Sequence, residues 1–353
     1  MAGQGKLYKM GLRPVYRVSP NSMKWKRCPG SLSWGPSEGN FSIKFSHTFT
    51  NFNSESDTAY FAWTYPYSFE QSLKYTQRLL RKFKEHEEIY IHREVLYYSR
   101  ERRPMEMITF TSKTKMMEER EALIDGCFPD AKGDPNYRPY QFDKPTVFIS
   151  SRVHPGETPA SFVLDGIWKF LTDEKSAQGR VLRERFVFKV VPMLNPDGVY
   201  RGYYRLDTLA QNLNRYYINP SKEKQPTIWA VKNAIKQQVD YGKIVLYVDL
   251  HAHASKRGCF MFGNSLSGEE ALKAMLLPKL ISMNSLNFDF MECSFSDKMM
   301  NCKDKKDGLS REGCGRVSIG KLTAIPNCYT LECNYASGRT INRLTPKINK
   351  ATG

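Results

Sequence analysis

The chain has 353 residues, of which 41% are hydrophobic and 25% are charged, a composition typical of a globular protein and not of a disordered one. No apolar run approaches the roughly 20 residues that cross a bilayer. The first residues, MAGQGKLYKMGLRP, contain no apolar segment of a signal peptide. We therefore expect a soluble protein that is neither secreted nor inserted in a membrane.

The formal net charge of +17 predicts an attraction to polyanions, because such a field raises the rate of encounter with them. Nucleic acid is one such polyanion. However, the sequence contains no recognisable nucleic-acid-binding module, no Gly-rich phosphate loop and no basic platform interleaved with aromatic residues. We therefore expect no nucleic-acid partner.

The first part of the chain predicts a small β domain. Residues 1–40 are polar and contain many Gly and Pro, so we expect them to be loosely ordered in part. Residues 41–64 alternate apolar and polar side chains, as strands do. A capping box at residues 68–71 then opens a helix. The expected domains are therefore residues 1–64 and residues 65–353.

Three features are predicted between this helix and the next strand. Residues 96–99 and 105–111 predict the two strands of a hairpin. Residues 115–143 predict a mixture of loop and short helix.

A β-branched, apolar run at residues 146–149 predicts a buried strand. It leads into the loop His154-Pro-Gly-Glu157, after which Thr158 and Pro159 are expected to be the N-cap and first position of a helix. An imidazole and a carboxylate separated by two residues can converge on one Zn²⁺ ion. The alternative is a surface loop with a capping Glu, because HxxE is short enough to occur by chance.

A second buried strand, at residues 243–251, also ends in a histidine. His251 is therefore the candidate third zinc ligand. Asp249 precedes it on the same face of the strand and is a candidate for a structural role behind it. His253 is a competing candidate for this third ligand. For His253 we favour the alternative interpretation, a loop histidine that donates hydrogen bonds.

A hydrolytic zinc site also needs a general base for its water. A third apolar strand, at residues 328–333, contains one isolated carboxylate, Glu332. A buried carboxylate is costly unless it is used or paired. Glu332 is therefore the candidate base, and an edge Glu that points to solvent is the alternative.

Polar and basic side chains follow the NPDG turn at residues 195–198. Arg is suited to planar, two-point capture of a carboxylate. These residues therefore predict a substrate with a carboxylate, and a solvated basic loop is the alternative. They are Arg201, Arg205, Asn212, Asn214 and Arg215.

Together, the segments HPGE, NPDG, NLNR, DLHAH and YTLE resemble the motifs of the zinc metallocarboxypeptidases, in the same order. The chain is most similar to the cytosolic carboxypeptidase group and its subtype-five branch, over about residues 40 to 340. The resemblance implies an α/β fold with a mixed, twisted β-sheet flanked by helices, preceded by a small β-sandwich-like N-terminal domain. It also implies hydrolysis of carboxy-terminal glutamate, including the polyglutamate side chains of tubulin and their γ-linked branch points.

The resemblance further implies one Zn²⁺ ion per chain and a role for each matching residue. The implied zinc ligands are His154, Glu157 and His251, and the implied catalytic residues are Glu332, as general base and acid, and Arg205, at the scissile carbonyl. The implied substrate-binding residues are Asn214 and Arg215, at the terminal carboxylate, and Arg316, at the substrate side chain.

The implied partners are glutamylated tubulin tails or other acidic protein C-termini. A basic rim upstream of Glu332 suits them, and a merely solvated loop is the alternative for each of its residues: Lys298, Lys303, Lys305, Lys306, Arg311 and Arg316. We expect a monomer in the cytoplasm, and we leave microtubules, cilia and the nucleus open as further places of action.

The sequence departs from the family pattern at three places. Ala252 stands where this group usually has Gly, and Ala fits there only if its φ angle is negative. The chain ends at Gly353, where the family continues with a helix, and we expect the first strands of the N-terminal domain to be lacking as well. We therefore expect an incomplete N-terminal domain and a catalytic domain without its C-terminal helix. The alternative function is a catalytically silent, basic protein that binds tubulin or nucleic acid; a carboxypeptidase with another end preference is a second alternative.

Overall fold

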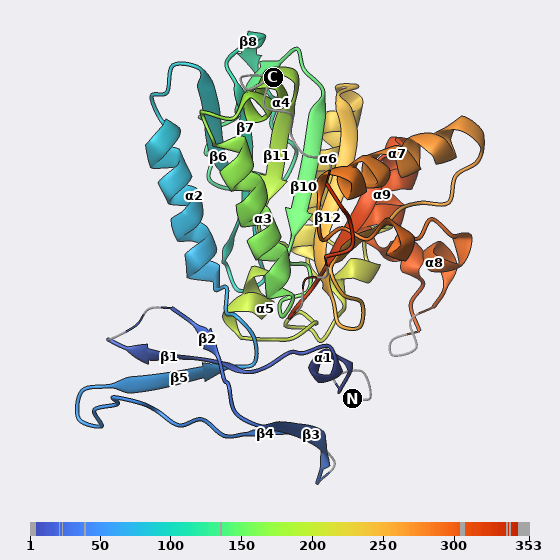
Figure 1. The fold of residues 1–353 in the computed structure, drawn as a ribbon. Helices are drawn as coiled ribbons and strands as arrows, with labels where there is room; N and C mark the ends of the chain where they lie inside the picture. The colour runs from blue at the N-terminus through green and yellow to red at the C-terminus, as the bar shows by residue number, and fades with distance from the viewer. Residues whose placement is uncertain are drawn as a thin grey trace, which may run out of the picture.

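The centre of the fold is a seven-stranded mixed β-sheet (Figure 1). The computed structural model describes residues 5–344 except 21, 23, 39, 135, 304–307, 337 and 339. The strands of this sheet are β6 (Ile89–Tyr98), β7 (Pro104–Ser112), β10 (Thr146–Ser151), β11 (Val187–Val191), β12 (Ile244–His253), β13 (Cys259–Phe262) and β14 (Cys328–Asn334). Their order across the sheet is β13-β14-β12-β10-β11-β7-β6.

The four central strands β14, β12, β10 and β11 run parallel to one another. Their carboxyl ends therefore meet at one edge of the sheet, where α/β proteins place their chemistry. The outer strands β13, β7 and β6 are antiparallel to their neighbours. The expected mixed sheet is thus confirmed, and so is the predicted β6–β7 hairpin.

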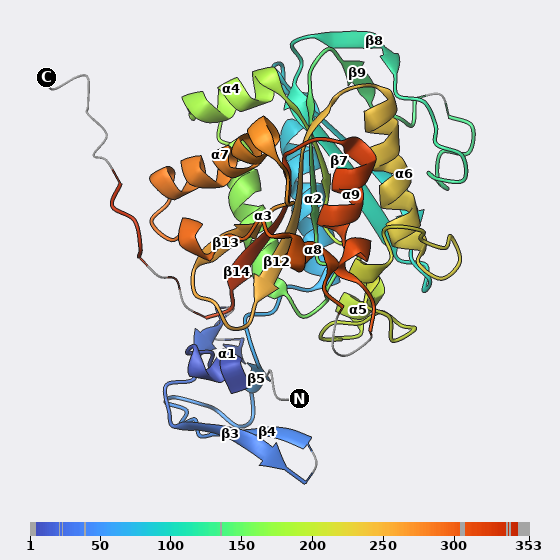
Figure 2. The same cartoon turned by 90° about the vertical axis from the view of Figure 1, so that its right-hand side faces the viewer.

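Helices cover both faces of the sheet, as Figure 2 shows from the side. One face carries α2 (Phe69–Phe83), α3 (Thr158–Leu171), α4 (Ala177–Arg185) and α7 (Gly268–Asn284). The opposite face carries α6 (Pro226–Asp240) and α9 (Gly315–Thr323). Shorter helical segments are α5 (Pro196–Tyr200), α8 (Asp297–Asn301), η1 (Leu213–Arg215), η2 (Phe290–Glu292) and η3 (Arg311–Gly313). No helix within the described residues is long and apolar enough to cross a membrane.

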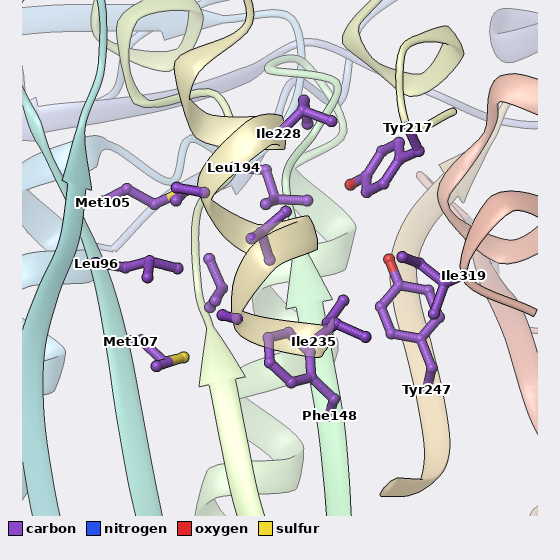
Figure 3. Packing of buried hydrophobic residues seen from close by; sticks show 14 of the residues in the cluster. Leu96, Met105, Met107, Phe148, Leu194, Tyr217, Ile228, Ile235, Tyr247 and Ile319 are labelled. Atoms are coloured by element: carbon purple, nitrogen blue, oxygen red, sulfur yellow. The ribbon is translucent and has the colours of Figure 1, made fainter. Parts of the chain in front are cut away.

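The alternation of side chains along β10 explains these two layers. Val147 and Ile149 pack into the cluster with α2 and α3, whereas Phe148 lies in the cluster with α6 and α9. Figure 3 shows Phe148 against Ile235 of α6, with Tyr247 of β12 beside them. Burial of each such side chain contributes about 1.5–3 kcal/mol. A strand buried on both faces is apolar throughout, which is why this run was recognisable in the sequence.

The N-terminal segment forms small β-sheets beneath the carboxyl ends of the central strands (Figure 1). Its elements are α1 (Gly5–Lys9), β1 (Val15–Ser19), β2 (Lys26–Arg27), β3 (Leu32–Ser37), β4 (Asn40–Phe45) and β5 (Thr58–Ala62). Residues 1–40, expected to be loosely ordered in part, contain α1, β1, β2 and β3 within the described residues. Leu7 and Tyr8 are buried against Ala252 and Tyr335, and this distant contact orders the segment. The domain boundary at residue 64 stays a prediction.

Two local expectations need correction. Residues 115–143 contain the paired strands β8 (Met116–Arg120) and β9 (Tyr140–Phe142), and no helix among those described. Helix α3 begins at Thr158, so its N-cap is Glu157, one residue earlier than expected, and no side-chain bond caps it. Glu157 is unavailable as a cap because its carboxylate faces two histidines. The capping box of α2 is confirmed in part, since Ser68 Oγ accepts the Gln71 N–H at 3.1 Å.

Candidate active site

Two neighbouring parallel strands bring three candidate zinc ligands together. The loop after β10 supplies His154 and Glu157, and β12 supplies His251. One ligand atom from each lies within 4.8 Å of the others. The two carboxylate oxygens of Glu157 lie 2.8 Å from His154 Nδ1 and 2.9 Å from His251 Nδ1. All three residues are buried, so the surface-loop interpretation of HxxE is wrong.

A hydrogen bond to Asn212 fixes which ring nitrogen of His154 faces the ligand cluster. His154 Nε2 lies 3.0 Å from Asn212 Oδ1. That oxygen also accepts the backbone N–H of Asn214, so it is an acceptor and His154 Nε2 must donate to it. The Nδ1 lone pair of His154 is then directed at the cluster, which is the tautomer that a metal ligand needs.

His251 is oriented in the same way by the residue that precedes it on the strand face. Its Nε2 donates to Asp249 Oδ2 at 2.7 Å, and Ser150 Oγ donates to the other Asp249 oxygen at 2.8 Å. Burial alone lowers the pKa of His251, but the charges of Asp249 and Glu157 outweigh it and raise that pKa well above the usual value. The negative charges that hold a proton at this imidazole would also hold a cation.

The donor set fits a catalytic Zn²⁺ site. Two imidazole Nδ1 atoms and one carboxylate are the kind and number of protein ligands that such sites use, with the remaining position open to water or substrate. Burial would raise the pKa of Glu157, but the two histidines lower it well below its usual value, so the group is a carboxylate. A backbone N–H, that of Ala252, holds one of its oxygens at 3.0 Å. Ala252 lies within β12 and not among the residues with positive φ, so Ala in place of Gly is not strained.

The candidate base lies beside the third ligand. Strand β14 pairs with β12 in a register that places Glu332 opposite His251. Glu332 is buried, and its Oε2 has no hydrogen-bond partner among the described residues. Burial raises the pKa of Glu332 to about 7, with Glu157 and Asp249 acting in the same sense and His251 and Arg205 opposing. The alternative of a solvent-facing edge Glu is wrong.

Arg205 reaches the ligand cluster from the segment after α5. Its guanidinium lies 3.4 Å from His154 Nδ1 and 3.5 Å from Glu157 Oε1. Its side chain is 32% exposed, so it borders the open side of the cluster.

Asn214 and Arg215 lie together in η1. Asn214 Oδ1 accepts the backbone N–H of Gly315 at 2.9 Å, and Arg215 donates to the Asn214 carbonyl at 2.7 Å. Tyr217 N–H donates to Gly313 O at 3.0 Å and ties this segment to η3, which precedes α9. The two residues are thereby held at one place in the cavity wall.

Arg316 enters the cavity from α9. It is 4% exposed, and its guanidinium donates to the Gly263 carbonyl and, at 2.7 Å, to Asn264 Oδ1. Its Nε–H has no partner among the described residues. Burial of this cation without a carboxylate partner lowers its pKa. The fixed guanidinium therefore retains donor capacity for an anionic group.

The HPGE and NPDG motifs are packed directly on each other. A Cβ on Gly198 would lie 2.4 Å from Pro155 Cγ, and one on Gly156 would lie 2.7 Å from the Tyr204 carbonyl oxygen. Gly156 N–H donates to that carbonyl at 2.8 Å. NPDG is the start of helix α5, capped by Asn195, and not the simple turn that was expected.

His253 does not join the ligand cluster. Its Nδ1 accepts the backbone N–H groups of Ser255 and Lys256, at 3.3 Å each. It lies at the end of β12 and accepts hydrogen bonds there, so its expected description as a loop donor is wrong.

The eight residues to which the family resemblance assigns a role in zinc binding, catalysis or substrate binding all line one cavity of about 340 Å³. The basic rim contributes Arg311 and Arg316 to this lining, whereas Lys305 and Lys306 lie outside the described residues. Two functional residues were not predicted from the sequence: Asn212 of the NLNR motif, which orients His154, and Lys6, which lines the cavity. Only the fold brings Lys6 to the site, so no local signal could have revealed it.

Comparison with known proteins gives a consistent picture. A family model described as zinc carboxypeptidase matches residues 76–219. Human "Cytosolic carboxypeptidase-like protein 5" is 34% identical over 98% of this chain and 49% of its own length. Mouse "Cytosolic carboxypeptidase 6" is 33% identical over 95% of this chain and 54% of its own length. The chain therefore spans about half the length of the curated relatives it matches.

A solved structure confirms the fold. A metallo-carboxypeptidase from Burkholderia cenocepacia superposes with a TM-score of 0.64, covering 97% of this chain and 75% of its own. Its sequence is 21% identical, so this likeness concerns the fold alone.

Proposed function

The chain belongs to the zinc carboxypeptidase family, and on this basis we propose that it is a metallocarboxypeptidase that removes glutamate from polyglutamylated proteins. The proposed substrate is chiefly tubulin, including glutamate joined through a γ-carboxyl at a branch point. The observation that carries this proposal is the cavity in which a zinc-type triad, a buried carboxylate and several cations meet.

The charges of the cavity support an acidic substrate. Five cationic side chains line it: Lys6, Arg205, Arg215, Arg311 and Arg316. Its acidic side chains are Glu157, within the triad, and Glu332, the proposed base. A pocket for Lys or Arg side chains would need a further acidic residue, and none lines this cavity within the described residues.

We assign the terminal residue of the substrate to three groups. Asn214 and Arg215 hold its free carboxylate, which makes the enzyme an exopeptidase. Arg316 binds its side-chain carboxylate through the donors that its contacts with Gly263 and Asn264 leave available. The recognition of two carboxylates on one residue selects glutamate or aspartate over neutral ends.

The chemical step is hydrolysis of the terminal amide bond. His154, Glu157 and His251 would hold a Zn²⁺ ion, which would polarise the scissile carbonyl and lower the pKa of the attacking water. Glu332 takes the proton of the attacking water and returns it to the leaving amine. Arg205 stabilises the negative charge that develops on the carbonyl oxygen.

The proposed partners are glutamylated tubulin tails or other acidic protein C-termini. The proposed place of action is the cytoplasm, with microtubules, cilia and the nucleus left open as further places, and with a monomer as the acting species. These assignments rest on the family group and on the basic cavity.

The test is mass spectrometry of peptides incubated with zinc-loaded protein. A set of peptides that differ only in a terminal Glu, Lys or Phe measures the end preference, and a branched glutamylated tubulin peptide measures branch-point removal. We expect release of free glutamate from the Glu-ended peptides and the loss of one residue from the branch. Faster release of Lys or Phe would contradict the assigned substrate class.

The silent-binding alternative predicts a different result in the same experiment. A chain that only binds would retain tubulin affinity, but it would release no glutamate even when metal analysis finds one zinc per chain. That outcome would remove the proposed activity and leave the fold assignment intact.

A further inference from the structure

The cavity receives one cation from the N-terminal segment. Four of its five cations belong to the segments that carry the substrate-binding residues or to the basic rim. The fifth, Lys6, lies on α1 (Gly5–Lys9), at the start of the N-terminal segment. Figures 1 and 2 both place α1 against the carboxyl-end side of the central strands.

The position of Lys6 is fixed by its neighbours along the chain. Leu7 and Tyr8 are 3% and 6% exposed, and they pack with Leu12 in one cluster. The same cluster contains Ala252, the residue after the ligand His251. The backbone of α1 is therefore anchored beside the metal-ligand strand, while the Lys6 side chain remains exposed at the mouth of the cavity.

Lys6 lines the cavity as an exposed cation. Within the part of the chain that the structure describes, no acidic side chain forms an ion pair with Lys6. Its ammonium group is thus available to an acidic group of the substrate.

Both carboxylates of the terminal substrate residue already have proposed partners, so neither is left for Lys6. The free carboxylate of that residue is assigned to Asn214 and Arg215, and its side-chain carboxylate to Arg316. Lys6 is an exposed residue of the cavity lining, so we place it where the rest of the substrate chain would leave the cavity. The side chains there belong to the residues that precede the scissile bond.

We propose that Lys6 is a specificity-determining residue, which selects substrates with an acidic side chain in the two positions before the terminal residue. This inference rests on the proposed function. It makes the N-terminal segment a part of the active site. It also predicts that a run of acidic residues is a better substrate than an isolated terminal glutamate.

The test compares three peptides that end in Ala-Ala-Glu, Ala-Glu-Glu and Glu-Ala-Glu. For Lys6→Ala, we expect kcat/KM on the two acidic peptides to fall about two- to fivefold through KM, the range for an exposed ion pair. The value for Ala-Ala-Glu should not change. Lys6→Glu should show a larger loss on the same two peptides. Lys9→Ala is the matched control, because Lys9 is exposed on the same helix and does not line the cavity.

Binding is measured separately, so that the inference does not depend on turnover. The same peptides with an N-methylated final amide bond, labelled with a fluorophore, report affinity by anisotropy. Equal affinity of wild type and Lys6→Ala for all three peptides, or an equal loss on all three, would overturn the role of Lys6. Wild-type protein that releases no glutamate but binds the acidic peptides through Lys6 would overturn the proposed activity alone.

Discussion

Glu332 occupies a position where burial and neighbouring charges of both signs act on one carboxylate. Burial raises its pKa to about 7, close to the pH at which a general base would work. Its Oε2 has no partner among the described residues, so no protein donor competes for the lone pairs that would receive a proton. These properties suit a base better than a structural ion pair.

The first prediction therefore concerns Glu332→Gln. We expect the variant to retain one zinc per chain, because Glu332 is outside the triad, and to lose turnover by a factor of about 10²–10⁴, the usual contribution of a general base. Metal analysis and glutamate release measure the two quantities. Glu269→Gln, on the exposed surface of α7, is the control. Full activity of Glu332→Gln would show that the base is assigned wrongly, and loss of zinc would show that Glu332 is a ligand.

Arg152 is a second residue whose position suggests a measurable role. It is fully buried, and its guanidinium donates to the Pro155 carbonyl through Nε at 3.1 Å and through a terminal nitrogen at 2.6 Å. The other terminal nitrogen donates to the Tyr67 carbonyl at 3.2 Å and to Ser161 Oγ at 2.8 Å. Arg152 thus connects the loop between His154 and Glu157 to helix α3 and to the segment before α2.

The second prediction is that Arg152→Leu weakens both folding and zinc binding. The lost hydrogen bonds leave buried acceptors unpaired, so the free energy of unfolding should fall by about 2–5 kcal/mol. Loosening of the ligand loop should weaken zinc binding by about 10–100-fold. Urea unfolding and competition with a zinc chelator measure these changes, and Arg180→Leu on the surface of α4 should leave both unchanged. An unaltered zinc affinity in Arg152→Leu would argue against this positioning role.

At the scale of elements, the active site depends on how the segment after β10 packs against the start of α5. Gly198 approaches Pro155 so closely that a Cβ would lie 2.4 Å from its Cγ atom. Asn195 holds both sides of this contact, because its side chain donates to the Val153 carbonyl at 3.3 Å and accepts the Gly198 N–H at 3.0 Å. The position of His154 therefore depends on a residue in another segment.

The third prediction is that Gly198→Ala lowers stability and activity together. The added methyl must displace Pro155, and such overpacking costs about 1–3 kcal/mol. The matched control is Gly166→Ala within α3, where a Cβ would meet nothing within 4 Å. That change should instead stabilise the protein by about 0.5–1 kcal/mol, because Ala is the better helix former. Thermal unfolding and glutamate release distinguish the two variants, and similar behaviour of both would contradict the packing argument.

The elements that the sequence predicted best are those with a strong local pattern. The strands β10, β12 and β14 are apolar runs, and each leads to a chemically distinctive residue. Their adjacency, which places Glu332 opposite His251, is a long-range property that the residues alone did not determine. It was expected only through the family resemblance.

The N-terminal segment shows why the remainder could not be predicted. Leu7, Tyr8 and Leu12 lie in a short stretch interrupted by Lys, Gly, Arg and Pro, which gives no helix or strand period. They are buried because they meet Ala252 and Tyr335 from the other end of the chain. Tertiary contacts therefore decide the order of this segment, and with it the presence of Lys6 in the cavity.

At the scale of the whole molecule, the basic charge is the property that the site and the rest of the chain share. The formal charge is +17, and the cavity itself is lined by more cations than carboxylates. A field of this sign attracts an acidic substrate over distances longer than a hydrogen bond and raises its rate of association. Dissolved ions screen such a field, with a Debye length of about 10 Å at 0.1 M salt.

The fourth prediction follows from this screening. Between about 0.05 and 0.5 M sodium chloride, we expect kcat/KM on a peptide that ends in several glutamates to fall severalfold, because screening weakens long-range attraction more than short buried contacts. The fall should appear in KM and not in kcat, since in the proposed binding mode Asn214, Arg215 and Arg316 hold the bound end inside the cavity. A peptide with one terminal Glu after neutral residues is the control and should lose much less. Equal salt dependence of the two peptides would mean that the net charge does not guide the substrate, and that recognition depends on the cavity contacts alone.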